Sequence, residues 1–154
     1  MIEVGIDDPA WSEAEPAAER LAQAAAAATL EHEGVKDDLD VAILLTSDER
    51  VRDLNARFRG KDAPTNVLAF PAPGGAGALG DVALAFGVCA QEASEQSKPL
   101  AHHLQHLTAH GVLHLLGYDH LTDSEAEAME ARERHILAGL GVRDPYEDDG
   151  QPGH

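Results

Sequence analysis

The chain has 154 residues and one cysteine, Cys89, so it has the size of a single domain and excludes an intramolecular disulfide framework. No stretch approaches the roughly 18 uninterrupted apolar residues of a membrane span, and the first ten residues contain no basic region leading into an apolar core. The formal net charge of -17 argues against non-specific binding to polyanions, which needs clustered Lys and Arg. We therefore expect a cytoplasmic protein that does not contact membranes.

The first predicted elements are a short strand and a long helix. The stretch "IEVGI" (2–6) has the apolar pattern of a strand. Residues 12–34 are predicted to form one helix, in which Ser12 and Glu15 make a capping box and Gly34 ends the helix. The alanine run within this segment favours helix formation and does not indicate a functional low-complexity tract.

A buried strand and a second helix follow. The stretch "DVAILLT" (40–46) is a nearly continuous apolar run, which is typical of a central strand. Ser47 then caps a helix at 48–60, and the apolar side chains on one face of it are Val51, Leu54 and Phe58. Five cationic residues lie in this helix and directly after it, and we call them the basic cluster: Arg50, Arg52, Arg57, Arg59 and Lys61. The cluster is either a solvated helix face or a local basic surface.

Two strands and two helices are predicted in the rest of the chain. The strands are "NVLAF" (66–70) and "DVALAF" (81–86). The glycine-rich stretch between them, 71–80, lacks the Lys-Ser/Thr ending of a phosphate-binding loop, so we interpret it as a flexible connection. Helical patterns cover 91–116, with an interruption at Lys98-Pro99, and 122–141, and the second begins with a capping box, "TDSE".

The order of these elements predicts the fold class. Strands and helices alternate early and helices cluster later, which favours an α+β fold with a mixed β-sheet and helices packed on it. We expect a single domain over residues 1–142. The remaining residues, 143–154, form an acidic tail rich in Gly and Pro that we expect to be disordered.

Three histidines in "HGVLHLLGYDH" are spaced to bind one metal ion. Residues four apart on a helix lie on one face with Cβ atoms about 6 Å apart, so His110 and His114 can direct their imidazoles at one ion. Gly117 can adopt the left-handed conformation that turns the chain, and His120 can then return to the same point. Three nitrogen ligands leave a tetrahedral position open, which favours one catalytic zinc ion per chain.

A purely structural histidine cluster is the alternative interpretation. Four histidines form a stripe at four-residue spacing: His102, His106, His110 and His114. Three successive positions span about 12 Å, too far for one ion, so we expect His106 to support the ligands from behind or to lie on the surface. Asp119, next to the third ligand, could orient an imidazole, accept a proton or stabilise the turn.

The histidine spacing alone points to a metzincin-like metalloprotease, but position 111 argues against it. In those proteases a glutamate directly after the first histidine takes a proton from the zinc-bound water, and this chain has Gly111 there. Zinc can still lower the pKa of bound water toward about 7 without a dedicated base. A phosphodiester suits such a site, because a cation and an arginine can together stabilise its negative charge.

Arg59 is the best candidate for this arginine. Its planar guanidinium can hold two phosphate oxygens, whereas Lys61 would act as a point charge. Thr65 and Asn66 offer uncharged donors immediately before a strand. The alternative interpretation is that Arg59 is an ordinary surface residue and that Thr65 and Asn66 only form a turn. We predict that these four residues bind substrate, and that Arg59 and His114 act in catalysis.

Four stretches resemble the YbeY family of bacterial metal-dependent endoribonucleases: "FRGKDAPTNVLAFP", "LGDVALA", "HGVLHLLGYDH" and "DSEAEAMEARERHIL". The similarity runs from about Val41 to Leu137. It implies a zincin-like fold, one zinc ion on three histidines, here His110, His114 and His120, and a functionally important arginine at Arg59.

The resemblance also implies single-strand-specific RNA cleavage, in maturation of the 3′ end of 16S ribosomal RNA and in ribosome quality control. The implied partners are single-stranded RNA, the small-subunit rRNA and the ribosome, with ribosomal proteins or GTPases as candidate protein partners. Two rival functions stay open: a metzincin-like metalloprotease, and a non-catalytic ribosome assembly factor with a structural zinc. Because the acidity of the chain conflicts with an RNA substrate, we expect the basic cluster to line the metal cleft while the acidic ends face away.

Overall fold

The computed structural model describes residues 1–35, 38–72 and 77–146 of the chain. The elements in these ranges are, in order, β1 (Ile2–Ile6), α1 (Ala10–Ala14), α2 (Ala18–His32), β2 (Asp40–Thr46), α3 (Asp48–Arg59), β3 (Val67–Pro71), β4 (Ala78–Ala85), α4 (Phe86–Glu95), α5 (Leu100–Leu115) and α6 (Asp123–Gly139). Among them is no helix that combines the length and apolar character needed to cross a bilayer.

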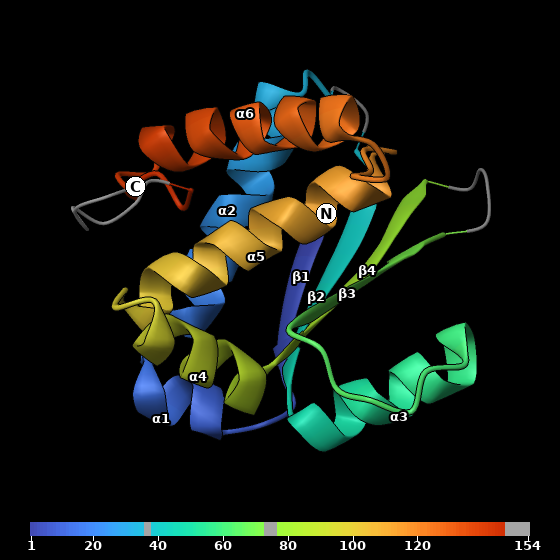
Figure 1. The fold of residues 1–154 in the computed structure, drawn as a ribbon, viewed down its shortest axis with the longest axis vertical. Helices are drawn as coiled ribbons and strands as arrows, with labels where there is room; N and C mark the ends of the chain where they lie inside the picture. Colours follow the sequence, from blue (N-terminus) through green and yellow to red (C-terminus); the bar gives the residue numbers. More distant parts are fainter. Residues whose placement is uncertain (36–37, 73–76, 147–154) are drawn as a thin grey trace.

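The strands form one mixed sheet in the order β1-β2-β4-β3. Strands β1, β2 and β4 are parallel, and β3 runs antiparallel to β4 at the edge (Figure 1). The central position of β2 explains its nearly continuous apolar sequence, because both of its faces are covered. The predicted α+β fold with a mixed sheet is thus confirmed.

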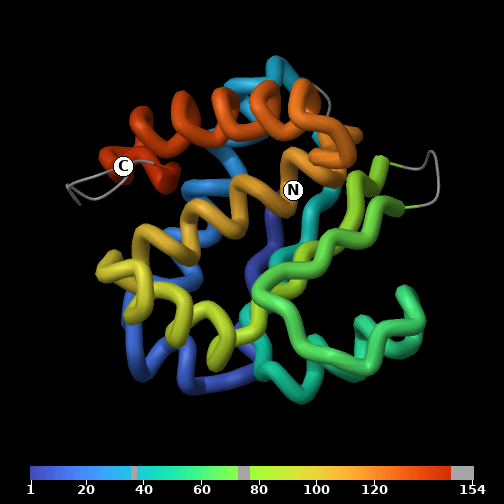
Figure 2. Tube along the Cα trace, viewed as in Figure 1, coloured from blue at the N-terminus to red at the C-terminus, as the bar shows by residue number. Residues whose placement is uncertain are grey.

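Helices cover the two faces of the sheet unequally. One face carries α2 and α5, with a core that includes Ile43, Val82 and Leu104. The other face carries α3, where Val51 packs against Leu68. Helix α6 contacts both α5 and α2, and the Cα trace shows it running beside α5 on the side away from the sheet (Figure 2). Helix α5 is therefore held between the sheet and α6.

The prediction of one long helix over residues 12–34 is wrong. The segment forms two helices, α1 and α2, and Glu15 between them is extended (φ -141°, ψ 96°). The cause is Pro16, because a proline disfavours helical geometry in the residue before it. Ser12 lies inside α1 and its hydroxyl donates to the Pro9 carbonyl, so it caps nothing. Gly34 does end α2, with φ at +69°.

The starts of α3 and α6 agree with the sequence, whereas the helical pattern predicted over 91–116 forms two helices, α4 and α5, of which the first begins earlier, at Phe86. Ser47 Oγ accepts from Arg50 N at the start of α3, and Thr122 Oγ1 accepts from Glu125 N at the start of α6, both at 3.1 Å. The expected apolar face of α3 holds only in part, because Val51 is buried but the Phe58 side chain is 68% exposed. Cys89 is fully buried, and burial raises the pKa of its thiol.

Two predicted segments fall partly outside the described residues. The glycine-rich connection joins β3 to β4 as expected, but residues 73–76 within it are not described. The tail prediction concerns residues 143–154, of which 147–154 are not described. The preceding residues are anchored to α6, where Arg134 Nε lies 3.1 Å from an Asp144 carboxylate oxygen.

Candidate metal centre and its cleft

The end of α5 and the turn after it bring three histidines together. His110 and His114 lie one helical turn apart on α5, which ends at Leu115. Gly117 then reverses the chain with φ at +103°, a backbone conformation that residues with a Cβ rarely adopt. Tyr118 N donates to Leu113 O at 3.1 Å and closes the turn. His120 returns to the helix end, and one ring nitrogen from each of the three histidines lies within 4.8 Å of those of the other two.

This arrangement could hold a metal ion, and its chemistry suits zinc. The Nε2 atoms of His110 and His114 are 3.2 Å apart. Two nitrogens bound to a tetrahedral zinc, each at about 2.0 to 2.1 Å, would be about 3.3 Å apart. Burial lowers the pKa of His114, and the neighbouring imidazoles of His110 and His120 lower it further. His114 is therefore kept neutral, which is the form of imidazole that binds a metal.

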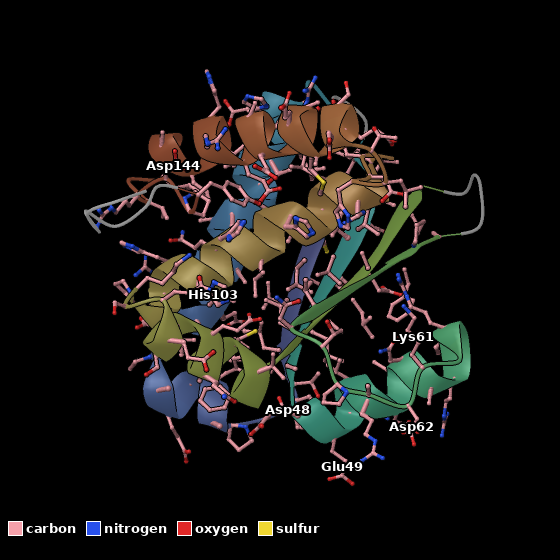
Figure 3. The ribbon with its side chains drawn as sticks, viewed as in Figure 1. Asp48, Glu49, Lys61, Asp62, His103 and Asp144 are labelled. Atoms are coloured by element: carbon pink, nitrogen blue, oxygen red, sulfur yellow. The ribbon has the colours of Figure 1, made fainter. Side chains whose placement is uncertain are left out.

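The histidines open onto a cleft of about 520 Å³. Four other predicted site residues line the same cleft: Arg59, Thr65, Asn66 and Asp119. Lys61 is not among the described residues that line it. Lys61 lies in the loop beyond α3, next to Asp62 (Figure 3), and its side chain is exposed.

Arg59 reaches the cleft from the last position of α3. Its Nη2 donates to the Ala69 carbonyl at 2.7 Å, and its guanidinium carbon lies 5.6 Å from the centre of the Phe70 ring. Both contacts are to β3, the edge strand. The guanidinium is thereby fixed beside the metal site, with further N–H donors for an anion.

Asn66 is held by its neighbours on both sides of its amide. Its Oδ1 accepts from Val67 N at 2.7 Å, and its Nδ2 donates to Glu92 Oε1 at 3.0 Å. The same Glu92 oxygen lies 2.9 Å from Nε2 of His103, which is buried between α4 and α5 (Figure 3). Asn66 is thus the cleft end of a polar network that runs into the protein.

Asp119 contacts the backbone of the third histidine. Its Oδ1 accepts from His120 N at 2.8 Å. Of the three roles considered from the sequence, this contact corresponds to stabilising the turn that presents His120.

The expectation that the whole basic cluster lines the metal cleft is wrong. Of its five members only Arg59 lines the cleft. Arg50 and Arg52 line a separate surface depression, and Arg52 is paired with Asp62 at 2.7 Å. Arg57 Nε lies 3.3 Å from an Asp53 oxygen on the same helix. The residues of α3 point in different directions around the helix, so proximity in sequence did not place them on one surface.

Gly111 lies where α5 meets the sheet. A Cβ at this position would be 2.6 Å from Val82 Cγ1 and 3.5 Å from Val67 Cγ2. The residue after the first histidine therefore has no room for a side chain, and the site has no counterpart of a protease glutamate there.

Sequence reasoning missed Glu133, a fully buried carboxylate behind the histidines. Its Oε2 lies 3.1 Å from His110 Nδ1, and its Oε1 lies 2.5 Å from His106 Nε2. Burial raises the pKa of Glu133, but the hydrogen bonds from His106 and His110 outweigh burial and lower the pKa to about 2. The sequence did contain an indication that Glu133 is buried, because it lies four residues after Met129 and three before Ile136, on the apolar face of α6.

Comparison with known proteins identifies the family. The chain matches the family Endoribonuclease YbeY over residues 6–141. A protein named Endoribonuclease YbeY from Paramagnetospirillum magneticum is 50% identical over 158 aligned positions, which cover 94% of each chain. The protein of the same name from Rhodopseudomonas palustris (strain BisB5) is 55% identical over 123 positions, which cover 72% of this chain but only 63% of that protein, less than two thirds of its length.

A solved structure shows the same fold. The solution structure of TM1509 from Thermotoga maritima superposes with a TM-score of 0.58 at 24% identity, covering 96% of this chain and 99% of that one. The family resemblance seen in the sequence motifs is confirmed by the match over residues 6–141. This chain belongs to the endoribonuclease YbeY family.

Proposed function

We propose that this protein is a zinc-dependent endoribonuclease that cleaves single-stranded RNA. One observation carries the proposal: Arg59 lines the same cleft as His110, His114 and His120, in a chain of the YbeY family. The three histidines would hold one zinc ion. The biological substrate would be the 3′ end of 16S rRNA in the cytoplasm, with a further role in ribosome quality control alongside ribosomal or GTPase partners.

The residues of the cleft have complementary tasks in phosphodiester cleavage. When bound, zinc would act as a Lewis acid on a phosphate oxygen and lower the pKa of a coordinated water. Arg59 binds the phosphate and stabilises the negative charge that develops on it. Because Ala69 O and the Phe70 ring already fix the guanidinium, little reorganisation is needed when the substrate arrives.

The remaining predicted residues would bind the RNA around the scissile phosphate. The Thr65 hydroxyl can donate to a phosphate or ribose oxygen from the cleft wall. Asn66, whose amide is held by Glu92, fixes the start of β3 and so the position of its neighbours in the cleft. Lys61, which is exposed outside the cleft, would attract the RNA backbone through its charge.

The edge strand argues against the rival protease function. An extended peptide substrate would bind by forming backbone hydrogen bonds with the free edge of β3. The backbone groups of Asn66 and Ala72 bond to β4, and the direction alternates along a strand, so the groups at the free edge belong to residues 67, 69 and 71. Val67 N is bonded to the Asn66 side chain and Ala69 O to Arg59. Pro71 has no N–H. Two of the backbone groups at the free edge are therefore already hydrogen-bonded and a third is absent, which makes β3 a poor partner for a peptide substrate.

The second rival, an assembly factor with a structural zinc, requires a closed metal site. A structural zinc site normally has four protein ligands. Among the described residues the metal-binding group has three members, and it faces a cleft of about 520 Å³. An accessible position of this kind favours catalysis.

The test is a direct comparison of substrates. Purified protein with a measured zinc content would be incubated with a single-stranded RNA, the same RNA as a duplex, and casein, each with and without a chelator. We expect chelator-sensitive cleavage of the single-stranded RNA alone. Cleavage of casein with RNA left intact would support the protease instead, and zinc-loaded protein that cleaves neither would support the assembly factor.

A further inference from the structure

The buried carboxylate of Glu133 stands out because the surrounding surface of α6 is apolar. Glu133 is 0% exposed, and its neighbours on this face, Met129, Ile136 and Leu137, are buried hydrophobic residues. Burying a charged carboxylate costs several kcal/mol unless its partners compensate. Packing alone would be better served by a leucine or methionine, so the carboxylate is present for its contacts.

The contacts of Glu133 determine which ring nitrogen carries the hydrogen in His106 and in His110, and His110 is the one that concerns the metal site. A carboxylate only accepts hydrogen bonds, so His110 Nδ1, at 3.1 Å from Oε2, must carry a proton. The lone pair of neutral His110 is then on Nε2. This is the nitrogen that lies 3.2 Å from His114 Nε2, where a shared ion would sit. Glu133 thus selects the tautomer and ring orientation that His110 needs as a ligand.

The C-terminal segment closes the other side of this carboxylate. The Tyr146 hydroxyl donates to Glu133 Oε1 at 2.6 Å, and its ring packs edge-on against His106. Arg134 lies over the Tyr146 ring at 5.3 Å, and Asp144 Oδ1 accepts from Tyr146 N at 2.8 Å. Tyr146 lies beyond the family match, which ends at residue 141. A residue outside the matched region therefore contacts the group that supports the first histidine.

We infer that Glu133 is a positioning residue for the metal site, holding His110 in its ligand tautomer, and that Tyr146 fixes Glu133 in turn. The inference rests on the proposed metal site. It extends that site to a chain of contacts from the C-terminal segment through Tyr146 and Glu133 to His110.

The experiment measures zinc affinity rather than activity. Zinc dissociation constants would be determined by chelator competition for the full chain and for Glu133→Gln, Tyr146→Phe and Glu127→Gln, together with the thermal stability of each zinc-free protein. Glu127 is an exposed acid on the same helix and serves as the matched control. We expect Glu133→Gln to weaken zinc binding by about 10- to 100-fold, as loss of a carboxylate behind a histidine ligand does. Tyr146→Phe should weaken it by a smaller factor, and Glu127→Gln should have no effect.

The outcomes separate this inference from the metal site itself. Wild-type protein that binds no zinc would overturn both. Wild-type protein that binds zinc, with Glu133→Gln and Tyr146→Phe folded and unchanged in affinity, would overturn the inference and leave the metal site standing. If Glu133→Gln does not fold, Tyr146→Phe decides, since it retains the carboxylate and removes only one hydroxyl. If these two variants are less stable in their zinc-free form but bind zinc as tightly as the wild type, the contacts of Glu133 and Tyr146 serve only the fold and the inference is wrong.

Discussion

Gly111 in α5 packs so closely on Val82 in β4 that a Cβ on the glycine would lie 2.6 Å from Val82 Cγ1. We therefore predict that Gly111→Ala destabilises the protein by about 1 to 3 kcal/mol, as overpacking of a core does. An alanine in a helix is otherwise stabilising by about 0.5 to 1 kcal/mol relative to glycine. At Gly139, the last residue of α6, a Cβ would point into open space, so Gly139→Ala should not be destabilising.

Chemical denaturation of the wild type and the two variants measures these differences in the free energy of unfolding. Equal effects of Gly111→Ala and Gly139→Ala would contradict the close packing of α5 on the sheet. Gly111→Glu should not produce a protease, because the larger side chain meets the same obstruction.

Replacement of Arg59 should reduce RNA cleavage far more than replacement of another arginine of α3. Arg59→Ala removes the charge beside the phosphate, and loss of such a donor typically lowers kcat by about 10²- to 10³-fold. Arg59→Lys should be intermediate, since a lysine keeps the charge but not the planar group. Arg50, which lines a separate depression, is the control, and Arg50→Ala should cleave at close to the wild-type rate. Similar losses in both alanine variants would indicate a general charge effect rather than a specific phosphate contact.

Zinc affinity should depend on pH in a defined direction. Burial and the neighbouring histidines lower the pKa of His114, so this ligand is neutral at pH 7 and protons do not compete there. The affinity should be nearly constant between pH 8 and 7. It should fall at pH values below about 6.5, where the pH approaches the lowered pKa of His114 and this ligand begins to take up a proton. Competition titrations across this range test the prediction, and an affinity that increases on acidification would refute it.

His103 should make the fold less stable as the pH falls. Burial lowers the pKa of His103, although Glu92 opposes this shift. In the unfolded chain the histidine titrates near about 6.5, so below that pH the unfolded state binds a proton that the folded state does not. The folded state therefore keeps its full free energy of unfolding above pH 6.5 and loses part of it as the pH falls toward the pKa of His103 in the folded state. His103→Gln should therefore lose less stability than the wild type between pH 7.5 and 5.5.

The measurement is the free energy of unfolding at both pH values. His135 on α6 is exposed, and His135→Gln serves as the control with a wild-type pH dependence. A wild-type pH dependence in His103→Gln as well would show that protonation of His103 is not coupled to unfolding.

The sequence predicted those features of the site that depend on local geometry. The spacing of His110, His114 and His120 follows from one helical turn and one glycine turn, and both are properties of short segments. The caps at Ser47 and Thr122 are local in the same way. The strand pattern likewise gave the central position of β2, because burial on both faces requires a continuous apolar run.

Other features depend on which elements pack together. The position of Glu133 behind His110 requires α6 to lie on α5, a contact that no local pattern specifies. The direction of each arginine around α3 likewise depends on how that helix sits on the sheet, so only Arg59 reached the cleft. The break at Pro16, by contrast, was a local signal that the alanine-rich composition outweighed in the prediction.

The contact of Arg59 with the Ala69 carbonyl also has a consequence for self-association. An edge strand with free backbone groups can pair with the same strand of another molecule and start aggregation. Arg59 and Pro71 make such pairing of β3 less favourable, since Arg59 occupies the Ala69 carbonyl and Pro71 has no N–H. Because Arg59→Ala would free this carbonyl for pairing with a second copy, the oligomeric state of an Arg59 variant should be compared with that of the wild type before its activity is assayed.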